Sequence, residues 1–144
     1  MKKYKKGYTS GVYDLFHVGH LNILKRAKEL CDYLIVGVST DEVVFNNKHI
    51  IPTICFKDRV AIVESIKYVD KVLPQTSYDV DGKIKAVLEN NIDVVFVGSD
   101  WLGTDKWNRI EKELKKIGCD VIYLPHTDGI SSTILRKKMI NEDK

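Results

Sequence analysis

The chain has 144 residues, 44% of them apolar and 30% charged, which is the size and composition of one ordinary globular domain. Its net charge of +3 is spread along the chain, which excludes nucleic acid as the expected partner and suits an anionic small molecule. No apolar run approaches the ~20 residues of a membrane helix, and no secretory signal follows the basic start, so we expect a cytoplasmic protein with no membrane partner. The cysteines Cys31, Cys55 and Cys119 show neither metal-site spacing nor a disulfide framework.

Apolar runs alternate with amphipathic stretches along the whole chain. The run 33–38 is continuously apolar, as in a strand buried on both faces, whereas Leu21, Leu24 and Ala27 recur at helical spacing. In chain order, the patterns predict strands at 8–12, 33–38, 71–73, 93–97 and 119–124, helices at 21–30, 57–68, 84–88, 107–117 and 131–140, and a loop at 46–53.

Strands that alternate with helices predict an α/β fold. We expect a Rossmann-like single domain over 1–144, with a parallel sheet of about five strands flanked by helices and joined by right-handed crossovers. Ligands of such sheets bind beyond the carboxyl ends of the strands, where the strand order reverses. The residues that directly follow each strand are therefore the first candidates for a functional site.

The segment 11–20, Gly-Val-Tyr-Asp-Leu-Phe-His-Val-Gly-His, follows the first predicted strand and opens the first predicted helix. His17 and His20 stand three residues apart, so both imidazoles can face one anion, and Gly19 lets the backbone approach it closely. A helix N-terminus favours phosphate, and donors placed there would stabilise a pentacoordinate phosphorus transition state. The pair could instead be structural or half of a zinc site, but the sequence shows no third ligand at useful spacing.

This motif resembles the His-x-Gly-His signature of the cytidylyltransferase-like nucleotidyltransferases, and the segment 129–133, Gly-Ile-Ser-Ser-Thr, resembles their second signature. Between the two, the segments 31–41, 66–70 and 98–101, together with Arg59, resemble the glycerol-3-phosphate cytidylyltransferases of that family. The resemblance implies transfer of CMP from CTP to a phosphorylated small alcohol, with glycerol 3-phosphate as the first choice. Pyrophosphate would leave, and the product would serve a teichoic-acid-type or capsule polymer.

The resemblance also assigns roles to individual positions. It implies catalytic roles for His17, His20, Lys48 and Arg136. It implies nucleotide binding by Gly11, Val12, Tyr13, Gly19, Asp100, Ser131, Ser132 and Thr133. It implies acceptor binding by Asp14, Arg59, Lys67, His126 and Thr127. A homodimer that pairs through 57–70, and Mg²⁺ bound with the nucleoside triphosphate, are expected on the same ground, without a dedicated metal site of the protein.

Each role has a plainer structural alternative. Lys48, Lys67 and Arg136 could be surface charges, Arg59 could be an ion-pair partner, and 131–133 could be only a helix cap. Asp100 could merely cap a turn.

The chain departs from the glycerol-3-phosphate cytidylyltransferase pattern at three positions. Ile50 replaces a lysine, and Lys67 and His126 replace arginines. These departures leave open another phosphorylated acceptor, such as phosphocholine or phosphoethanolamine. An ATP donor stays open because 130–136 also resembles adenylyl-transferring relatives, as does a nucleotide-binding regulator without catalysis. The sequence lacks a P-loop and a Gly-x-Gly-x-x-Gly motif, which argues against a P-loop kinase and a dinucleotide dehydrogenase.

Overall fold

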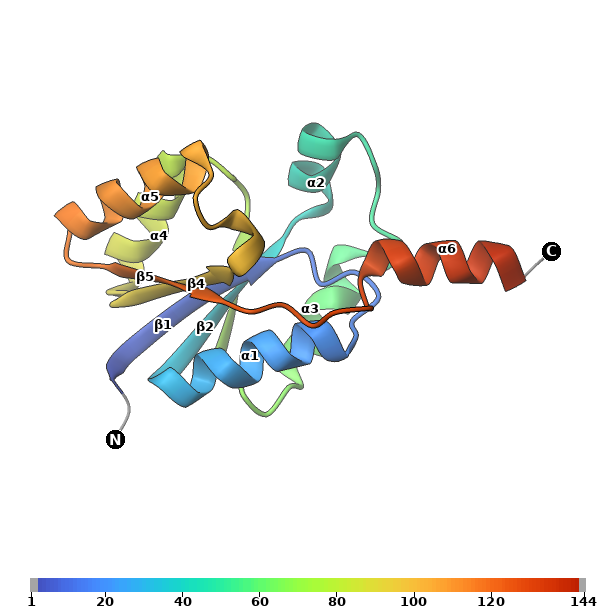
Figure 1. Cartoon of the computed structure of the whole chain (residues 1–144), viewed down its shortest axis with the longest axis horizontal. Helices are drawn as coiled ribbons and strands as arrows, with labels where there is room; N and C mark the ends of the chain where they lie inside the picture. The colour runs from blue at the N-terminus through green and yellow to red at the C-terminus, as the bar shows by residue number, and fades with distance from the viewer. Residues whose placement is uncertain (1–2, 143–144) are drawn as a thin grey trace.

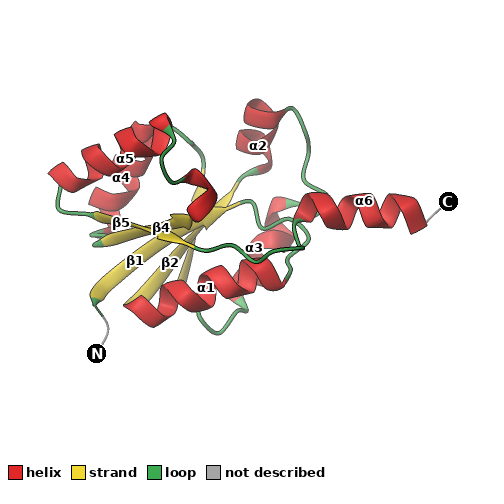
Figure 2. Cartoon of the chain, viewed as in Figure 1, coloured by secondary structure: helices red, strands yellow, loops and turns green. Residues whose placement is uncertain are grey.

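Five parallel strands form a single sheet in the computed structural model, which describes residues 3–142 (Figures 1 and 2). The spatial order is β3-β2-β1-β4-β5, and every neighbouring pair is parallel. The strands are β1 (Tyr4–Gly11), β2 (Cys31–Ser39), β3 (Lys71–Gln75), β4 (Val94–Gly98) and β5 (Asp120–Leu124). The predicted Rossmann-like α/β fold is confirmed.

Helices cover both faces of this sheet (Figure 1). They are α1 (Val18–Leu30), α2 (Asp41–Lys48), α3 (Phe56–Glu64), α4 (Val80–Asn90), α5 (Asp105–Lys116) and α6 (Ser132–Glu142), with a 3₁₀ turn η1 (Ser99–Trp101). Helices α1 and α3 lie against one face and α4 and α5 against the other, while α2 stands off the sheet and α6 projects away from it. Within residues 3–142, no helix combines the length and the apolar character needed to cross a membrane.

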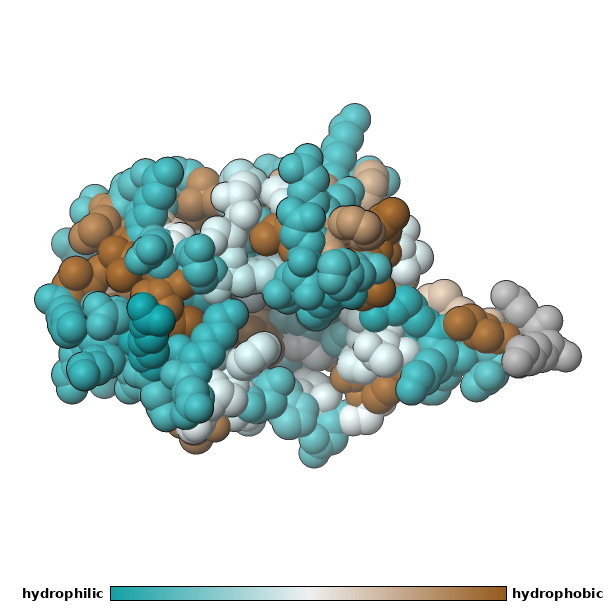
Figure 3. All heavy atoms as spheres, turned by 90° about the horizontal axis from the view of Figure 1, so that it is seen from above, coloured by the Kyte–Doolittle hydropathy of each residue, from teal (hydrophilic) through white to brown (hydrophobic). Residues whose placement is uncertain are grey.

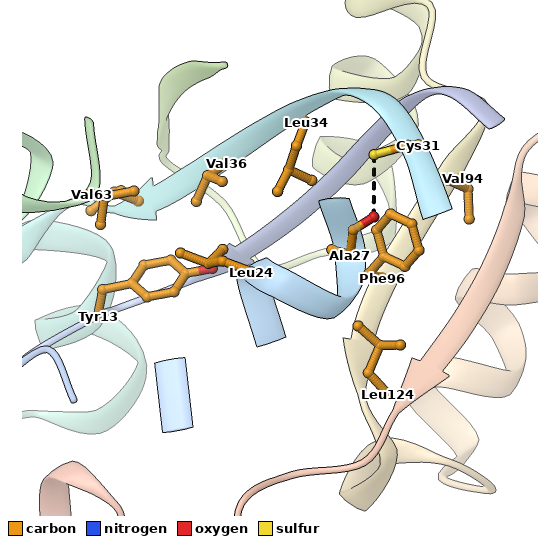
Figure 4. Close-up of a cluster of buried hydrophobic side chains, with 11 residues drawn as sticks. Tyr13, Leu24, Ala27, Cys31, Leu34, Val36, Val63, Val94, Phe96 and Leu124 are labelled. Carbon is orange, nitrogen blue, oxygen red and sulfur yellow. Dashed lines mark hydrogen bonds between the residues drawn. The ribbon is translucent and has the colours of Figure 1, made fainter. Parts of the chain in front are cut away.

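The hydrophobic core lies in two layers, one on each side of the sheet. On one side Leu34 and Val36 of β2 meet Leu24 of α1, and none of these three side chains is exposed (Figure 4). On the other side Ile35 belongs to a second cluster with Trp107 and other residues of α4 and α5. Full burial of each such side chain contributes about 1.5–3 kcal/mol. This explains why 34–38 are apolar at successive positions, since both faces of β2 are covered there; Tyr33, which was predicted to be buried with them, is 37% exposed.

The strand order determines where a ligand can reach the sheet. The chain builds β1, β2 and β3 outward on one side of β1, then crosses back to place β4 and β5 on the other. The order therefore reverses between β1 and β4, and the loops that leave their carboxyl ends must diverge. The segment 12–17 and the turn η1 begin at this crevice.

The observed elements differ from the predicted ones chiefly at α2, α3 and β1. Helix α2 was not predicted, because it has eight residues and buries only Val44, which gives a weak apolar pattern. The signal that could have revealed it is the helix cap Thr40, whose side chain accepts a hydrogen bond from Val43 N–H. Helix α3 ends at Glu64, four residues before the predicted end, because Ile66 and Tyr68 pack against the core from turns that prolong the apolar pattern. Strand β1 begins at Tyr4, since pairing with β2 continues through the lysine-rich start.

Candidate active site

Two histidines cap the first turn of α1, and each imidazole accepts a hydrogen bond from a backbone N–H at the start of the helix. The backbone N–H of Gly19 donates to His17 Nδ1 at 3.0 Å, and the backbone N–H of His17 donates to His20 Nδ1 at 3.2 Å. A ring nitrogen that accepts a hydrogen bond carries no proton, so these bonds assign the proton of each neutral imidazole to Nε2. The local fold thus leaves two Nε2–H donors for a ligand.

Both imidazoles are held in the neutral form. Burial lowers the pKa of His17, and burial together with the charge of His17 lowers the pKa of His20 to about 4, against a smaller opposing effect of Asp14. The two rings stack with their centroids 3.8 Å apart, and Tyr13 meets His20 edge-on at 5.3 Å. Two imidazolium ions at this spacing would repel each other, so the stack itself favours neutral rings.

The backbone around this cap is tightly constrained. Tyr13 and Leu15 have φ angles of 56° and 51°, a left-handed conformation that non-glycine residues rarely adopt. At Gly19, a Cβ atom would lie 2.8 Å from His17 Cε1 and 2.9 Å from Nδ1. Gly19 is therefore required because the imidazole of its own helix cap occupies that space.

Asp14 joins the two sequence motifs. Its carboxylate accepts backbone hydrogen bonds from Thr53 and Ile54, each at 2.9 Å, and one from Arg136 Nη1 at 3.0 Å. Its backbone carbonyl accepts a hydrogen bond from the Ser132 hydroxyl of α6. The start of the last helix is thereby fastened to the loop that follows the first strand.

Two adjoining cavities of about 170 Å³ each open beside this junction. We name one the phosphate-side cavity, after the ligand predicted for its residues; its lining includes Val12, Tyr13, Asp14, His20, Lys48, Ser132, Thr133 and Arg136. The other, which we name the nucleoside-side cavity on the same ground, is lined by Gly11, Val12, Tyr13, His20, Gly98 and Trp101, among others. Figure 3, which looks onto the molecule from the side of α2, shows a hollow rimmed mainly by hydrophilic side chains. The structure thus gathers three of the four predicted catalytic residues around one cavity, and His17 stacks on the imidazole of His20.

The hydroxyl groups at the start of α6 have partners within the chain. Ser131 Oγ accepts from Ile134 N–H at 3.0 Å, which is a helix-cap bond, and the Ser132 hydroxyl donates to Asp14. Thr133 Oγ1 accepts a bond of 3.4 Å from Arg136 Nη2. Ser131 therefore caps the start of α6, as the structural alternative predicted. Contact of residues 131–133 with phosphates stays a prediction.

The turn η1 forms the far rim of the nucleoside-side cavity. Asp100 is exposed there, and a Cβ at Gly98 would lie 2.6 Å from Asp100 Oδ1. Trp101 is 44% exposed and lines the cavity, with Lys106 Nζ 6.0 Å from the centroid of its ring. Trp107, by contrast, is a core residue with 6% exposure.

Arg59 lies inside the protein rather than at the cleft surface. Its guanidinium is fully buried and donates to three backbone carbonyls, those of Val12, Ser39 and Ile54, at 2.7–2.8 Å. It also donates to the carboxylate of Asp41 at 2.6 Å. Arg59 therefore holds the carboxyl ends of β1 and β2 together, and direct contact with an acceptor would require this cage to open.

Three further predicted acceptor residues are not gathered at the cleft. Lys67 precedes β3, so it lies at the amino edge of the sheet, with Nζ 5.2 Å from the centroid of the Tyr68 ring. His126 Nε2 pairs with Asp128 Oδ1 at 3.3 Å on an exposed loop. Thr127 Oγ1 accepts from Asn22 Nδ2 at 2.8 Å. Within the described residues 3–142, none of these three side chains lines either of the two cavities that His20 lines.

Sequence reasoning missed a third cavity, of about 280 Å³, that adjoins the other two. Its walls include Ser39 and Gln75, which end β2 and β3, together with Tyr78 and Lys83. Ser39 and Gln75 could have been found by the rule that ligands bind where parallel strands end. Nothing in the sequence distinguishes Lys83 from a surface lysine, since its burial comes from the packing of α4, which buries Lys83 and Val87 one turn apart.

The cleft offers few ligands for a metal ion. In the part of the chain that the structure describes, no group of three His, Cys, Asp or Glu residues is positioned to hold one. Both oxygens of Asp14 are engaged by Thr53, Ile54 and Arg136. The residues present do not form a Mg²⁺ cage, so Mg²⁺ would have to arrive with a triphosphate, which keeps most of its ligands outside the protein.

The cytidylyltransferase-like family model matches residues 8–138. Glycerol-3-phosphate cytidylyltransferase of Bacillus subtilis is 40% identical over 94% of this chain and 97% of its own length, and that of Staphylococcus aureus is 40% identical over 96% and 98%. Among solved structures, a lipopolysaccharide core biosynthesis protein of Thermoplasma volcanium is 28% identical, with a TM-score of 0.69 over 85% of this chain and 96% of that one. The chain belongs to the cytidylyltransferase-like family.

Proposed function

We propose that the chain is a glycerol-3-phosphate cytidylyltransferase, which transfers CMP from CTP to glycerol 3-phosphate and releases pyrophosphate. The observation that carries this proposal is the phosphate-side cavity, where His20, Lys48 and Arg136 converge at the point at which the strand order reverses. The likeness to curated relatives of that activity over 94–97% of both chains supports the choice of substrates.

The proposed reaction needs positioning and charge stabilisation more than proton transfer. An oxygen of the acceptor phosphate, already ionised near neutral pH, attacks the α-phosphorus of CTP; that P–O bond forms as the bond to pyrophosphate breaks. The neutral Nε2–H groups of His17 and His20 would donate to phosphate oxygens as negative charge builds up. Lys48 and Arg136 would neutralise the departing pyrophosphate.

The proposal includes partners and a setting. CTP and a phosphorylated small molecule are the substrates, Mg²⁺ accompanies the triphosphate, and the enzyme is a homodimer that pairs through 57–70. The CDP-glycerol would supply glycerol phosphate units for a surface polymer of teichoic-acid or capsule type. We expect this work to be done in the cytoplasm, where CTP is available.

A pyrophosphate-release screen tests the proposal. The four nucleoside triphosphates are each combined with glycerol 3-phosphate, phosphocholine and phosphoethanolamine, with Mg²⁺ present throughout. We expect the highest kcat/KM for CTP with glycerol 3-phosphate. A higher kcat/KM for ATP, or for another acceptor, would contradict the proposal. Both outcomes are worth measuring, because the curated relatives include an ethanolamine-phosphate cytidylyltransferase at 37% identity and an FAD synthase at 36% identity.

A further inference from the structure

One face of helix α1 holds the segment that connects β5 to α6. We name this segment the connector and define it as residues 125–131, which belong to no helix or strand. Arg26 Nη1 donates to the backbone carbonyl of Pro125 at 2.7 Å. Asn22 Nδ2 donates to Thr127 Oγ1 at 2.8 Å. Two polar side chains of the helix that begins at the histidine pair are thus spent on the connector.

The contact points follow the periodicity of the helix. A third one lies in its first turn, where a Cβ on Gly19 would be 3.4 Å from Ile130 Cγ2. Positions 19, 22 and 26 are separated by three and four residues, so they lie on one face of α1. Their partners come in the reverse order, since the connector meets position 26 first and position 19 last. The connector therefore runs back along α1 toward the histidine cap, as Figure 1 shows.

The course of the connector decides where α6 begins. None of residues 132–141 is buried, and α6 projects away from the sheet. A helix of 11 residues is marginal in water without tertiary packing, so the body of α6 contributes little to its own placement. Its position depends on its first turns, where Ser132 and Arg136 bond to Asp14, and on the connector that precedes them. The contacts on α1 therefore help to set the distance between the histidine pair and Arg136.

We propose that Asn22 and Arg26 are positioning residues for nucleotidyl transfer, which hold the second sequence motif beside the first through Thr127 and Pro125. Neither residue lines any of the three cavities of the cleft, so each acts through the connector. The inference rests on the proposed function and deepens it, because it assigns the alignment of the two phosphate-binding motifs to residues outside the cleft. A shift of about 1 Å in such groups can cost on the order of 10²-fold in rate.

The test compares Asn22→Leu and Arg26→Met with Lys25→Met. Leucine and methionine remove the polar group and favour a helix at least as well as the residues they replace, so α1 should stay folded. Lys25 is an exposed lysine between the two positions and serves as the control. We measure hydrogen exchange, the Kd for CTP by calorimetry with Mg²⁺ present, and kcat/KM for CTP with glycerol 3-phosphate.

We expect exchange at 126–136 to become about 5-fold faster or more in Asn22→Leu and in Arg26→Met, relative to exchange in β2. The Kd for CTP should rise by about 5–10-fold, with a matching or larger fall in kcat/KM. Lys25→Met should resemble the wild type in all three measurements. Unchanged exchange in both variants would overturn the inference. Faster exchange with an unchanged Kd and kcat/KM would overturn it too, because the two residues would then serve the fold alone.

A double-mutant cycle tests the link between Asn22 and Thr127 itself. Thr127→Val removes the hydroxyl that accepts the bond and keeps the branched shape. If the two side chains act as one link, adding Thr127→Val to Asn22→Leu should leave the Kd for CTP within about 2-fold of that of Asn22→Leu. Losses that add in full would show that the two residues act separately, which would overturn the role assigned to Asn22.

The binding and exchange measurements separate this inference from the proposed function, because neither needs an acceptor. A wild type that binds CTP but releases no pyrophosphate with glycerol 3-phosphate would contradict the proposed function alone. Weaker CTP binding by Asn22→Leu and Arg26→Met would still support the positioning role in that case. A wild type without affinity for CTP would contradict both.

Discussion

Arg136 Nη1 lies 3.0 Å from the carboxylate of Asp14, and this ion pair connects the first and last motifs of the chain across 122 residues of sequence. Asp14 is almost completely buried, whereas the side chain of Arg136 is about one-third exposed and reaches into the phosphate-side cavity. The same carboxylate holds the backbone of Thr53 and Ile54. One buried acidic group therefore positions two parts of the site, the start of α6 and the segment after α2.

We predict that Asp14→Asn loosens α6 and weakens nucleotide binding. The amide retains one acceptor oxygen for three donors, so at least one charge-assisted bond is lost, at a cost of about 2 kcal/mol. Denaturant unfolding should show this loss, hydrogen exchange should increase in α6, and the KM for CTP should rise. Asp32→Asn, at an exposed position on β2, is the control. Unchanged exchange in α6 would show that the ion pair does not order the helix.

Gly19→Ala should inactivate the site through His17. Alanine favours a helix over glycine by about 1 kcal/mol, but here its Cβ would lie 2.8 Å from the imidazole that caps α1. We expect lower turnover without global unfolding. A double-mutant cycle checks the cause: in the His17→Ala background, which lacks the ring, adding Gly19→Ala should cost little. A full additive loss there would exclude the imidazole as the source of the effect.

The neutral state of His20 makes stability depend on pH. Its pKa is about 4 in the folded chain and 6.5 in the unfolded chain, so the unfolded state binds more protons between these values. The contribution is complete above pH 6.5 and is lost progressively as the pH falls toward 4. Between pH 7 and pH 5 this loss is about 2 kcal/mol. Urea unfolding at both pH values should show a smaller loss in the free energy of unfolding for His20→Asn than for the wild type, because asparagine keeps an acceptor atom but cannot titrate. An equal loss in both proteins would contradict the assignment of this pH dependence to His20.

Arg59→Lys tests whether Arg59 positions the site from within. A lysine keeps the charge, but it lacks the planar fork with which the Arg59 guanidinium reaches three carbonyls and a carboxylate. Since the side chain is fully buried, we expect the free energy of unfolding to fall by about 3 kcal/mol or more. Arg109→Lys, on the exposed face of α5, is the matched control. A stable Arg59→Lys variant that shows only a raised KM for the acceptor would instead support direct contact with substrate.

Much of the fold was predictable because the central strands β1, β2 and β4 and the helices that cover the sheet bury apolar side chains. The run 33–38 and the face around Leu24 indicated burial directly, and the strand–helix alternation indicated a parallel sheet. Helix α2 escaped prediction because it buries a single side chain and depends mainly on its Thr40 cap.

The site was predictable where residue type, spacing and a helix start coincide, as at His17, Gly19 and His20. It was not predictable where a role depends on burial. Arg59 and Lys83 look alike in sequence as isolated basic residues, yet one is saturated by carbonyls and the other has its Nζ 5.1 Å from the centroid of the Trp107 ring. Only packing of α3 and α4 against the sheet distinguishes the two, and pairing of residues far apart, such as Asp14 with Arg136, requires the complete topology.

The central claim is that His17 and His20 act as paired Nε2–H donors to the reacting phosphate. Single-turnover pyrophosphate release from CTP, measured for the wild type, His17→Asn and His20→Asn, tests it most directly, because asparagine can retain the capping bonds while the Nε2–H donor is lost. We predict a fall in rate of about 10²–10³ in each variant, with an unfolding midpoint close to that of the wild type at pH 7.5. Rates within a few-fold of the wild type in both folded variants would contradict the claim.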